Sequence, residues 1–396
     1  MRKILIALAV VAASSAAHAQ KTPKRPELFA GADTNDARAY LQLGTVMLKN
    51  DPEKAGDAFY WATRIDPANA EAFYSRRVAY LLANPRRYAQ YESGDKRTVQ
   101  SKEMQQMDSL LGRALMLNPV FVRRHERTAL IALIKFWSED GQGGSVTVTE
   151  ADINRYIDDV ARNGANEGLR AEMAYADGDY SDALRYYVTA LKTSKDKAGI
   201  HVERGRIFLQ TGHPDSASAE FGAALDELRK KDKKDFVVFY NSKASLEVSQ
   251  GIAAEQAGRM GDARSAYSHA LEEDLAYYPA HLRLGYLALD SRDTTTALSE
   301  LDLAVQLRPD DGLLHQRYGF ALLSAGKYDM AIEQLKKATQ LEPYFALGFR
   351  QLGEAYEAAG KKPEAAAAYK QFLNVASRSD NMRAQVEAKL PSLAGQ

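Results

Sequence analysis

Two stretches of the chain, LGYLALDSRDTTTALSELDLAVQLRP at residues 284–309 and YGFALLSAGKYDMAIEQLKKATQLEP at residues 318–343, begin 34 residues apart. The second residue of each stretch is a glycine. Glycine recurs at the same interval before and after them, at Gly251, Gly285, Gly319 and Gly353. Two alanine positions keep the interval as well, at Ala263, Ala297, Ala331 and Ala365, and at Ala270, Ala304 and Ala338. When several residue types keep one period, the chain is an array of stacked repeats.

Each period predicts two antiparallel helices joined by a turn. Glycine inside a helix costs roughly 0.5–1 kcal/mol relative to alanine, so its recurrence needs a packing reason. Small residues let the two helices approach closely, and we expect larger side chains to fill the space between neighbouring hairpins. These larger residues come four positions after the small alanine and are Tyr267, Leu301, Leu335 and Tyr369.

The ends of the predicted helices carry the expected residues. Gly326-Lys327-Tyr328 and Gly178-Asp179-Tyr180 each end one helix and begin the next. Pro309 and Pro343 end second helices, because proline lacks the N–H group and its ring clashes with the preceding turn.

This order of Leu-Gly, Ala, Tyr or Phe or Leu, Ala and Pro resembles the tetratricopeptide repeat (TPR), a helical hairpin of the same period. The best matches are Leu284–Pro309 and Tyr318–Pro343, with Leu352–Tyr369 close behind. The resemblance implies an all-α fold, a right-handed superhelical solenoid of TPR-type helix-turn-helix repeats. It also implies binding of other proteins rather than catalysis.

The repeats are regular in only part of the chain. We divide the chain into a degenerate TPR-like region at residues 36–165, a regular array at residues 166–376, and a capping helix and tail at residues 377–396. The first region contains an insertion at Asn84–Met104, and the array contains an extension at residues 229–240. A polar-faced cap keeps the last repeat of a solenoid soluble.

The N-terminus has the parts of a secretory signal peptide: a positive start, the apolar run Ile4–Ala13 and the cleavage site Ala17-His18-Ala19. We expect residues 1–19 to be removed and residues 20–35 to form an extended linker. The apolar run is shorter than the roughly 20 residues of a membrane helix. The sequence therefore predicts an exported bacterial protein in the periplasm, with secretion into the medium as the alternative.

Charge and cysteine content exclude several functional classes. The 52 Lys and Arg residues balance the 52 Asp and Glu residues, whereas a general nucleic-acid binder needs a net basic surface. The absence of cysteine excludes disulfides, thiolate catalysis and a lipid attached through a thiol.

None of the common catalytic, metal-binding or nucleotide-binding motifs is present. His201, His281 and His315 occupy equivalent repeat positions and are expected to be packing residues, because stacked helices lie about 10 Å apart and zinc ligands lie about 2 Å from the metal. Gly141–Gly144 is either an anion cradle or, more simply, a flexible loop. We predict no cofactor, no metal and no catalytic residue.

A basic run, Arg229–Lys234, is followed by the apolar residues Phe236–Tyr240. The run either meets an anionic polysaccharide, lipid or acidic partner, or is a solvated helix end whose cations favour the helix dipole. The apolar stretch is a contact site if it is exposed and core if it opens the next hairpin.

In the TPR family, the first helices of the hairpins line a concave groove that holds a peptide or helix of the partner. The resemblance places eight candidate residues of the last three repeats in this groove: Leu282, Arg283, Tyr286, Gln316, Arg317, Phe320, Arg350 and Glu354. Arg283 and Arg317 are one period apart and could together grip a carboxylate; the other interpretation is an ordinary solvated groove. Leu282 and Tyr286 stand where the family's carboxylate clamp has polar residues.

The sequence thus predicts a non-enzymatic scaffold or adaptor in the bacterial cell envelope. It would act within an assembly such as a secretion or polysaccharide-export machine. The first alternative is a periplasmic chaperone or assembly factor for secreted or outer-membrane clients. The second is an enzyme that uses residues 84–165, where the repeat pattern fails.

Overall fold

The computed structural model describes residues 22–92, 95–121, 167–231 and 242–393, with isolated positions between 125 and 159. In these parts every regular element is a helix and no strand occurs. None of the described helices is long and apolar enough to cross a membrane. The predicted all-α solenoid of paired helices is confirmed.

Three features of the sequence lie outside the described residues. They are the signal peptide at residues 1–19, the glycine-rich stretch Gly141–Gly144 and the apolar stretch Phe236–Tyr240.

The N-terminal helices form two hairpins, α1–α2 and α3–α6, which pack on each other. The short helices α4 and α5 lie in the insertion between α3 and α6. The bounds are α1 (Ala37–Met47), α2 (Pro52–Ile65), α3 (Ala70–Ala83), α4 (Pro85–Glu92), α5 (Lys96–Val99) and α6 (Lys102–Leu117).

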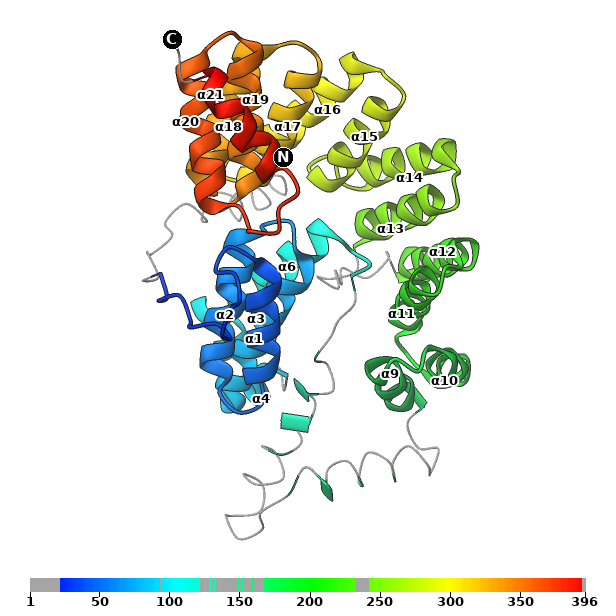
Figure 1. Ribbon diagram of the computed structural model, residues 1–396. Helices are drawn as coiled ribbons and strands as arrows, with labels where there is room; N and C mark the ends of the chain where they lie inside the picture. The colour runs from blue at the N-terminus through cyan, green and yellow to red at the C-terminus, as the bar shows by residue number, and fades with distance from the viewer. Residues whose placement is uncertain are drawn as a thin grey trace.

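The regular array consists of stacked hairpins that follow one curve from α9 to α20, as Figure 1 shows. The final helix, α21 (Arg383–Leu393), packs on α20 and covers the end of the stack. The array helices are α9 (Glu167–Asp177), α10 (Tyr180–Thr193), α11 (Lys197–Gln210), α12 (Pro214–Lys231), α13 (Lys243–Gln256), α14 (Met260–Glu273), α15 (Tyr278–Asp290), α16 (Thr294–Leu307), α17 (Gly312–Ser324), α18 (Tyr328–Leu341), α19 (Ala346–Ala358) and α20 (Lys362–Val375).

The periodic glycines lie directly beneath large side chains of the same hairpin. The pairs are Gly44 with Phe59, Gly205 with Phe221, Gly251 with Tyr267, Gly285 with Leu301, Gly319 with Leu335, and Gly353 with Tyr369. Each large residue covers the glycine of its own hairpin, and Tyr267 and Leu301 also belong to buried clusters that include residues of the next hairpin. Because glycine has no Cβ, the second helix can bring its large side chain against the first helix backbone.

The turns inside the hairpins use a left-handed residue. Gly326 (φ 72°) and Gly178 (φ 81°) stand in the two turns named from the sequence. At the matching position between α15 and α16 the chain has Arg292 with φ 61°. A residue with a Cβ is disfavoured at this φ, so the α15–α16 turn carries backbone strain that the glycine turns avoid.

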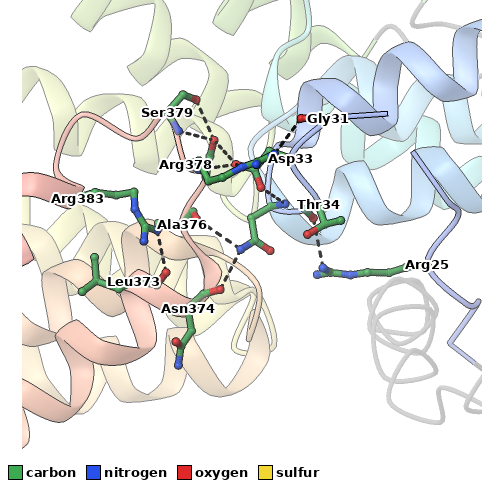
Figure 2. A network of polar contacts seen from close by, with 12 residues as sticks. Arg25, Gly31, Asp33, Thr34, Leu373, Asn374, Ala376, Arg378, Ser379 and Arg383 are labelled. Carbon is green, nitrogen blue, oxygen red and sulfur yellow. Dashed lines mark hydrogen bonds and ion pairs between the residues drawn. The ribbon is translucent and has the colours of Figure 1, made fainter. Parts of the chain in front are cut away.

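The N-terminal helices lie on the inner side of the curve formed by the array (Figure 1). Polar contacts join the segment before α1 to the loop between α20 and α21, as Figure 2 shows. The Asn35 side chain donates to the Asn374 carbonyl at 2.9 Å, and the Ser377 hydroxyl donates to the Asp33 carboxylate at 3.0 Å. Arg378 donates to the Gly31 carbonyl at 2.9 Å. The beginning and the end of the described chain are thus held together.

Replacing Gly319 by leucine should lower the melting temperature, because a Cβ at Gly319 would lie 2.6 Å from the Leu335 Cγ atom. Overpacking of this kind costs about 1–3 kcal/mol. Gly261→Leu is the matched control, since a Cβ at Gly261 meets no atom within 4 Å. Circular dichroism melting curves measure the difference; a Gly319→Leu protein that melts with the control would contradict this account of the glycine period.

Candidate protein-binding surface

We call the surface formed by the first helices α11, α13, α15, α17 and α19 the inner face. Part of it is covered by α6 and the residues that come directly after α6. Val120 is buried with Val202 and Leu209 of α11, and the Arg206 Nε atom donates to the Pro119 carbonyl at 3.2 Å. Met116 packs against the apolar clusters on both sides of α15. The chain therefore occupies part of its own inner face.

Arg113 of α6 makes the central polar contact of this covered region. Its guanidinium group binds both carboxylate oxygens of Asp311, with Nη2 at 3.0 Å from Oδ1, and donates to the Tyr278 hydroxyl at 3.3 Å. Asp311 is almost fully buried and also accepts from the Leu313 backbone N–H at the start of α17. Burial opposes the charge of Arg113, but Tyr278 and Asp311 raise its pKa. A buried pair of this geometry ties α6 to both α15 and α17.

A second ion pair lies one repeat further along the array. The Arg64 Nη1 atom of α2 lies 2.9 Å from the Glu342 Oε2 atom at the end of α18. Burial raises the pKa of Glu342 to about 7, although Arg64 and Arg113 both lower it. Glu342 therefore changes its charge near neutral pH.

Aromatic side chains extend the contact between α2 and the array. The rings of Trp61 and Tyr344 meet edge to face, with centroids 5.1 Å apart. The Arg25 guanidinium group lies over both rings, at 4.4 Å from Trp61 and 5.1 Å from Tyr344. Such stacking keeps the segment before α1 in place.

Two of the eight candidate groove residues do not reach solvent. Leu282 is 8% exposed and belongs to the apolar cluster of α15 to α20. Gln316 is 5% exposed and donates to the Gln351 side chain of α19 at 2.6 Å. These side chains link neighbouring first helices.

Two of the candidate arginines already have carboxylate partners. The Arg283 Nη1 atom lies 3.2 Å from the Glu255 Oε2 atom of the preceding repeat. Arg350 forms an ion pair with Glu354 four residues later in α19. A partner that bound these arginines would have to compete with their own carboxylates.

The remaining candidates form what we call the open strip: Tyr286, Arg317 and Phe320. The Arg317 guanidinium group stacks over the Tyr286 ring at 5.4 Å, and no carboxylate lies within ion-pair distance of Arg317 in the described chain. Burial raises the pKa of Asp66 in the α2–α3 loop, and Arg317 is among the positive groups that oppose this rise. Phe320 is 43% exposed. The strip combines a cation that makes no ion pair in the described chain with an exposed aromatic ring.

The repeated histidines bind side chains within their own hairpins. The Nδ1 atoms of His201 and His281 lie 2.7 Å from Glu220 and Glu300, and His315 makes the same contact with Gln334. These histidines join the first helix of a hairpin to the second. Within the described ranges, no group of three or more His, Asp or Glu residues is placed to hold a metal ion.

The described part of the basic run is engaged in ion pairs. Arg229 binds Glu247 at 2.9 Å and Glu273 at 3.2 Å, and Lys230 binds Glu227 at 2.8 Å. Arg229 thus joins α12 to α13 and α14, whereas Lys230 pairs within α12.

The covered part of the inner face was missed by sequence reasoning. From the sequence alone, Asp311 is expected to cap a helix, and Arg113 is expected to lie on the exposed face of a helix. The two residues are separated by 198 positions, and no spacing pattern connects them.

Family comparisons agree with the architecture. Models described as tetratricopeptide repeat match residues 174–234 and 248–312, and one described as TPR repeat matches residues 319–360. These three parts of the chain are tetratricopeptide repeats. A search of curated proteins finds no match for this TPR protein.

Several solved TPR structures are similar to it in part. YrrB, described as a TPR protein with an unusual peptide-binding site, is 20% identical, with 52% of this chain and 98% of YrrB covered and a TM-score of 0.40. MamA from Desulfovibrio magneticus is 22% identical, with 46% and 95% covered and a TM-score of 0.38. The C-terminal part of a TPR protein from Cytophaga hutchinsonii is 16% identical, with 56% and 78% covered and a TM-score of 0.41.

Arg113→Met should separate the unfolding of the N-terminal hairpins from that of the array, because it leaves Asp311 buried without its cation. Removing one member of a buried pair costs about 3–5 kcal/mol. Differential scanning calorimetry should show a lower first transition. Adding Asp311→Asn, which keeps an oxygen for the Leu313 N–H, should recover part of the loss. A single variant that unfolds like the parent would show that this contact does not hold α6 on the array.

Glu342→Gln tests the charge at the second ion pair. The pKa of Glu342 is about 7 in the folded chain and has the ordinary value of 4.5 when the chain is unfolded. Ionisation of Glu342 therefore reduces folding stability as the pH rises from about 4.5 to 7. Urea unfolding at pH 5 and pH 8 should show the variant gaining stability relative to the parent at the higher pH. A difference that is the same at both values would contradict the raised pKa.

Proposed function

We propose that this TPR protein is a non-enzymatic scaffold of the bacterial cell envelope that binds a segment of a partner protein along the open strip. The tetratricopeptide repeats support protein binding in general. The setting in the envelope rests on the signal-peptide pattern of residues 1–19.

The observation that carries this proposal is the combination of Arg317 and Phe320 on one first helix. Phe320 is one of several large apolar side chains that stay exposed, and it lies on a first helix of the array. Arg317 is held over Tyr286, so its orientation is set before a partner arrives. Preorganised aromatic and arginine side chains are the residues that contribute most to protein interfaces.

These features define the partner segment that fits the strip. An apolar side chain would pack on Phe320, and an acidic group nearby would bind the free edge of Arg317. The segment would be short, because α6 and the residues directly after it already cover the inner face around α11 and α13.

Arg317→Glu combined with Phe320→Ser should abolish capture of the partner and leave helicity unchanged. The control is Arg185→Glu with Val188→Ser on α10, where an arginine and an apolar side chain at the same spacing are exposed on a second helix of a hairpin. In-cell cross-linking followed by mass spectrometry identifies the captured protein. The same spectra report the N-terminus of the mature chain, which we expect at Gln20 in the periplasmic fraction.

Three results would overturn parts of the proposal. Equal capture by the strip variant and the control would exclude the open strip as the binding surface. Many weakly captured unfolded proteins, in place of one stoichiometric partner, would favour the chaperone alternative. A full-length chain that retains residues 1–19 in the cytoplasm would exclude the envelope setting.

A further inference from the structure

A cleft of about 380 Å³ lies where the N-terminal hairpins meet the array. Its walls come from α2, α3 and α6 on one side, and from the α16–α17 loop and the end of α18 on the other. The cleft exists only because the N-terminal hairpins are packed against this part of the array. It is separate from the open strip, whose residues do not line it.

Four arginines line the cleft, and two of them are already bound to carboxylates of the protein. Arg64 is paired with Glu342, and Arg113 is paired with Asp311. These two ion pairs join α2 and α6 to the array.

The other two arginines have aromatic contacts and no carboxylate partner in the described chain. The Arg76 guanidinium carbon lies 4.8 Å from the Tyr60 ring centroid, and that of Arg308 lies 5.5 Å from the Tyr278 ring centroid. Burial lowers the pKa of Arg76, and the Asp57 carboxylate of α2, which lies beyond ion-pair distance, offsets this only in part. A guanidinium group stacked on a ring still presents the N–H groups of its edge to a ligand.

The wall between these cations is partly apolar. Tyr60, Phe73 and Leu110 line it together with the hydroxyl groups of Thr63 and Ser109. A ligand that fits must therefore carry an apolar or aromatic body as well as an anionic group.

We propose that this cleft binds a monocarboxylate whose apolar body lies against Tyr60 and Phe73 and whose carboxylate is held by Arg76 and Arg308. Two of the three carboxyl groups in the lining, those of Asp311 and Glu342, are already bound to Arg113 and Arg64, which leaves Arg76 and Arg308 for a ligand. A monocarboxylate brings a single negative charge close to the acidic side chains of the lining, whereas a phosphate monoester brings close to two and is repelled more strongly by them. The planar carboxylate also matches the planar edge of a guanidinium group.

This site does not depend on the proposed partner segment or on export. The carboxylate has two possible sources: a small organic acid, or the C-terminal end of a polypeptide. Both present the same group to Arg76 and Arg308, and they differ in the body to which that carboxylate is attached.

The test is isothermal titration calorimetry on the mature full-length chain with two carboxylate probes and their neutral amides. Benzoate with benzamide represents a small organic acid, and acetyl-Ala-Phe with its C-terminal amide represents a chain end. We expect at least one carboxylate to bind saturably and its amide to bind about tenfold more weakly or worse, since a charged hydrogen bond contributes about 1.5–3 kcal/mol. The tighter of the two probes identifies the source.

Arg76→Gln should weaken binding of that probe by about tenfold or more. Arg308→Gln should do the same, and because its side chain is exposed, this variant tests the site without disturbing the fold. Arg185→Gln, which removes another arginine stacked on a tyrosine ring, is the matched control and should bind like the parent.

Several outcomes would overturn the proposal. They are binding of neither carboxylate, equal binding of a carboxylate and its amide, unchanged binding by both Arg76→Gln and Arg308→Gln, or tighter binding of phenyl phosphate than of benzoate.

Discussion

The ion pair between Arg113 and Asp311 is the interaction on which the rest of the structure depends. Isolated charges are costly to bury, so once α6 places Arg113 against the array, Asp311 must stay opposite it. This constraint sets the position of the N-terminal hairpins on the inner side of the curve (Figure 1). The covered inner face, the arginine-lined cleft and the uncovered strip at Phe320 all result from that position.

The regular hairpins could be predicted from the sequence, because their contacts are local and repeat every 34 residues. Gly319 and Leu335 belong to one hairpin, and their spacing alone shows that small and large side chains must meet. The structure adds that the large side chain also covers the glycine of its own hairpin. A period reports which positions are equivalent, and it does not report whether a large side chain points within its hairpin or toward the next one.

The candidate site could be predicted only in part. Repeat register placed Arg317 and Phe320 on a first helix, and both residues lie in α17. Register could not show that Gln316 is buried against Gln351 or that Arg283 is paired with Glu255. It also could not reveal the contact of Arg113 with Asp311, because that contact joins a degenerate repeat to a regular one across most of the chain. Stacking within the array is periodic, whereas the packing of the N-terminal hairpins depends on particular side chains.

The central claim is that the N-terminal hairpins keep a fixed position against the array in solution. The chain has no cysteine, so single cysteines at the exposed positions Val46 and Lys337 can each carry a spin label. The distance between the two labels, measured by double electron–electron resonance on the mature protein, tests the claim most directly. We predict one narrow distance distribution. A broad distribution that extends over many separations would contradict the account, because the hairpins would then leave the inner face and both the cleft and the boundaries of the open strip would be lost.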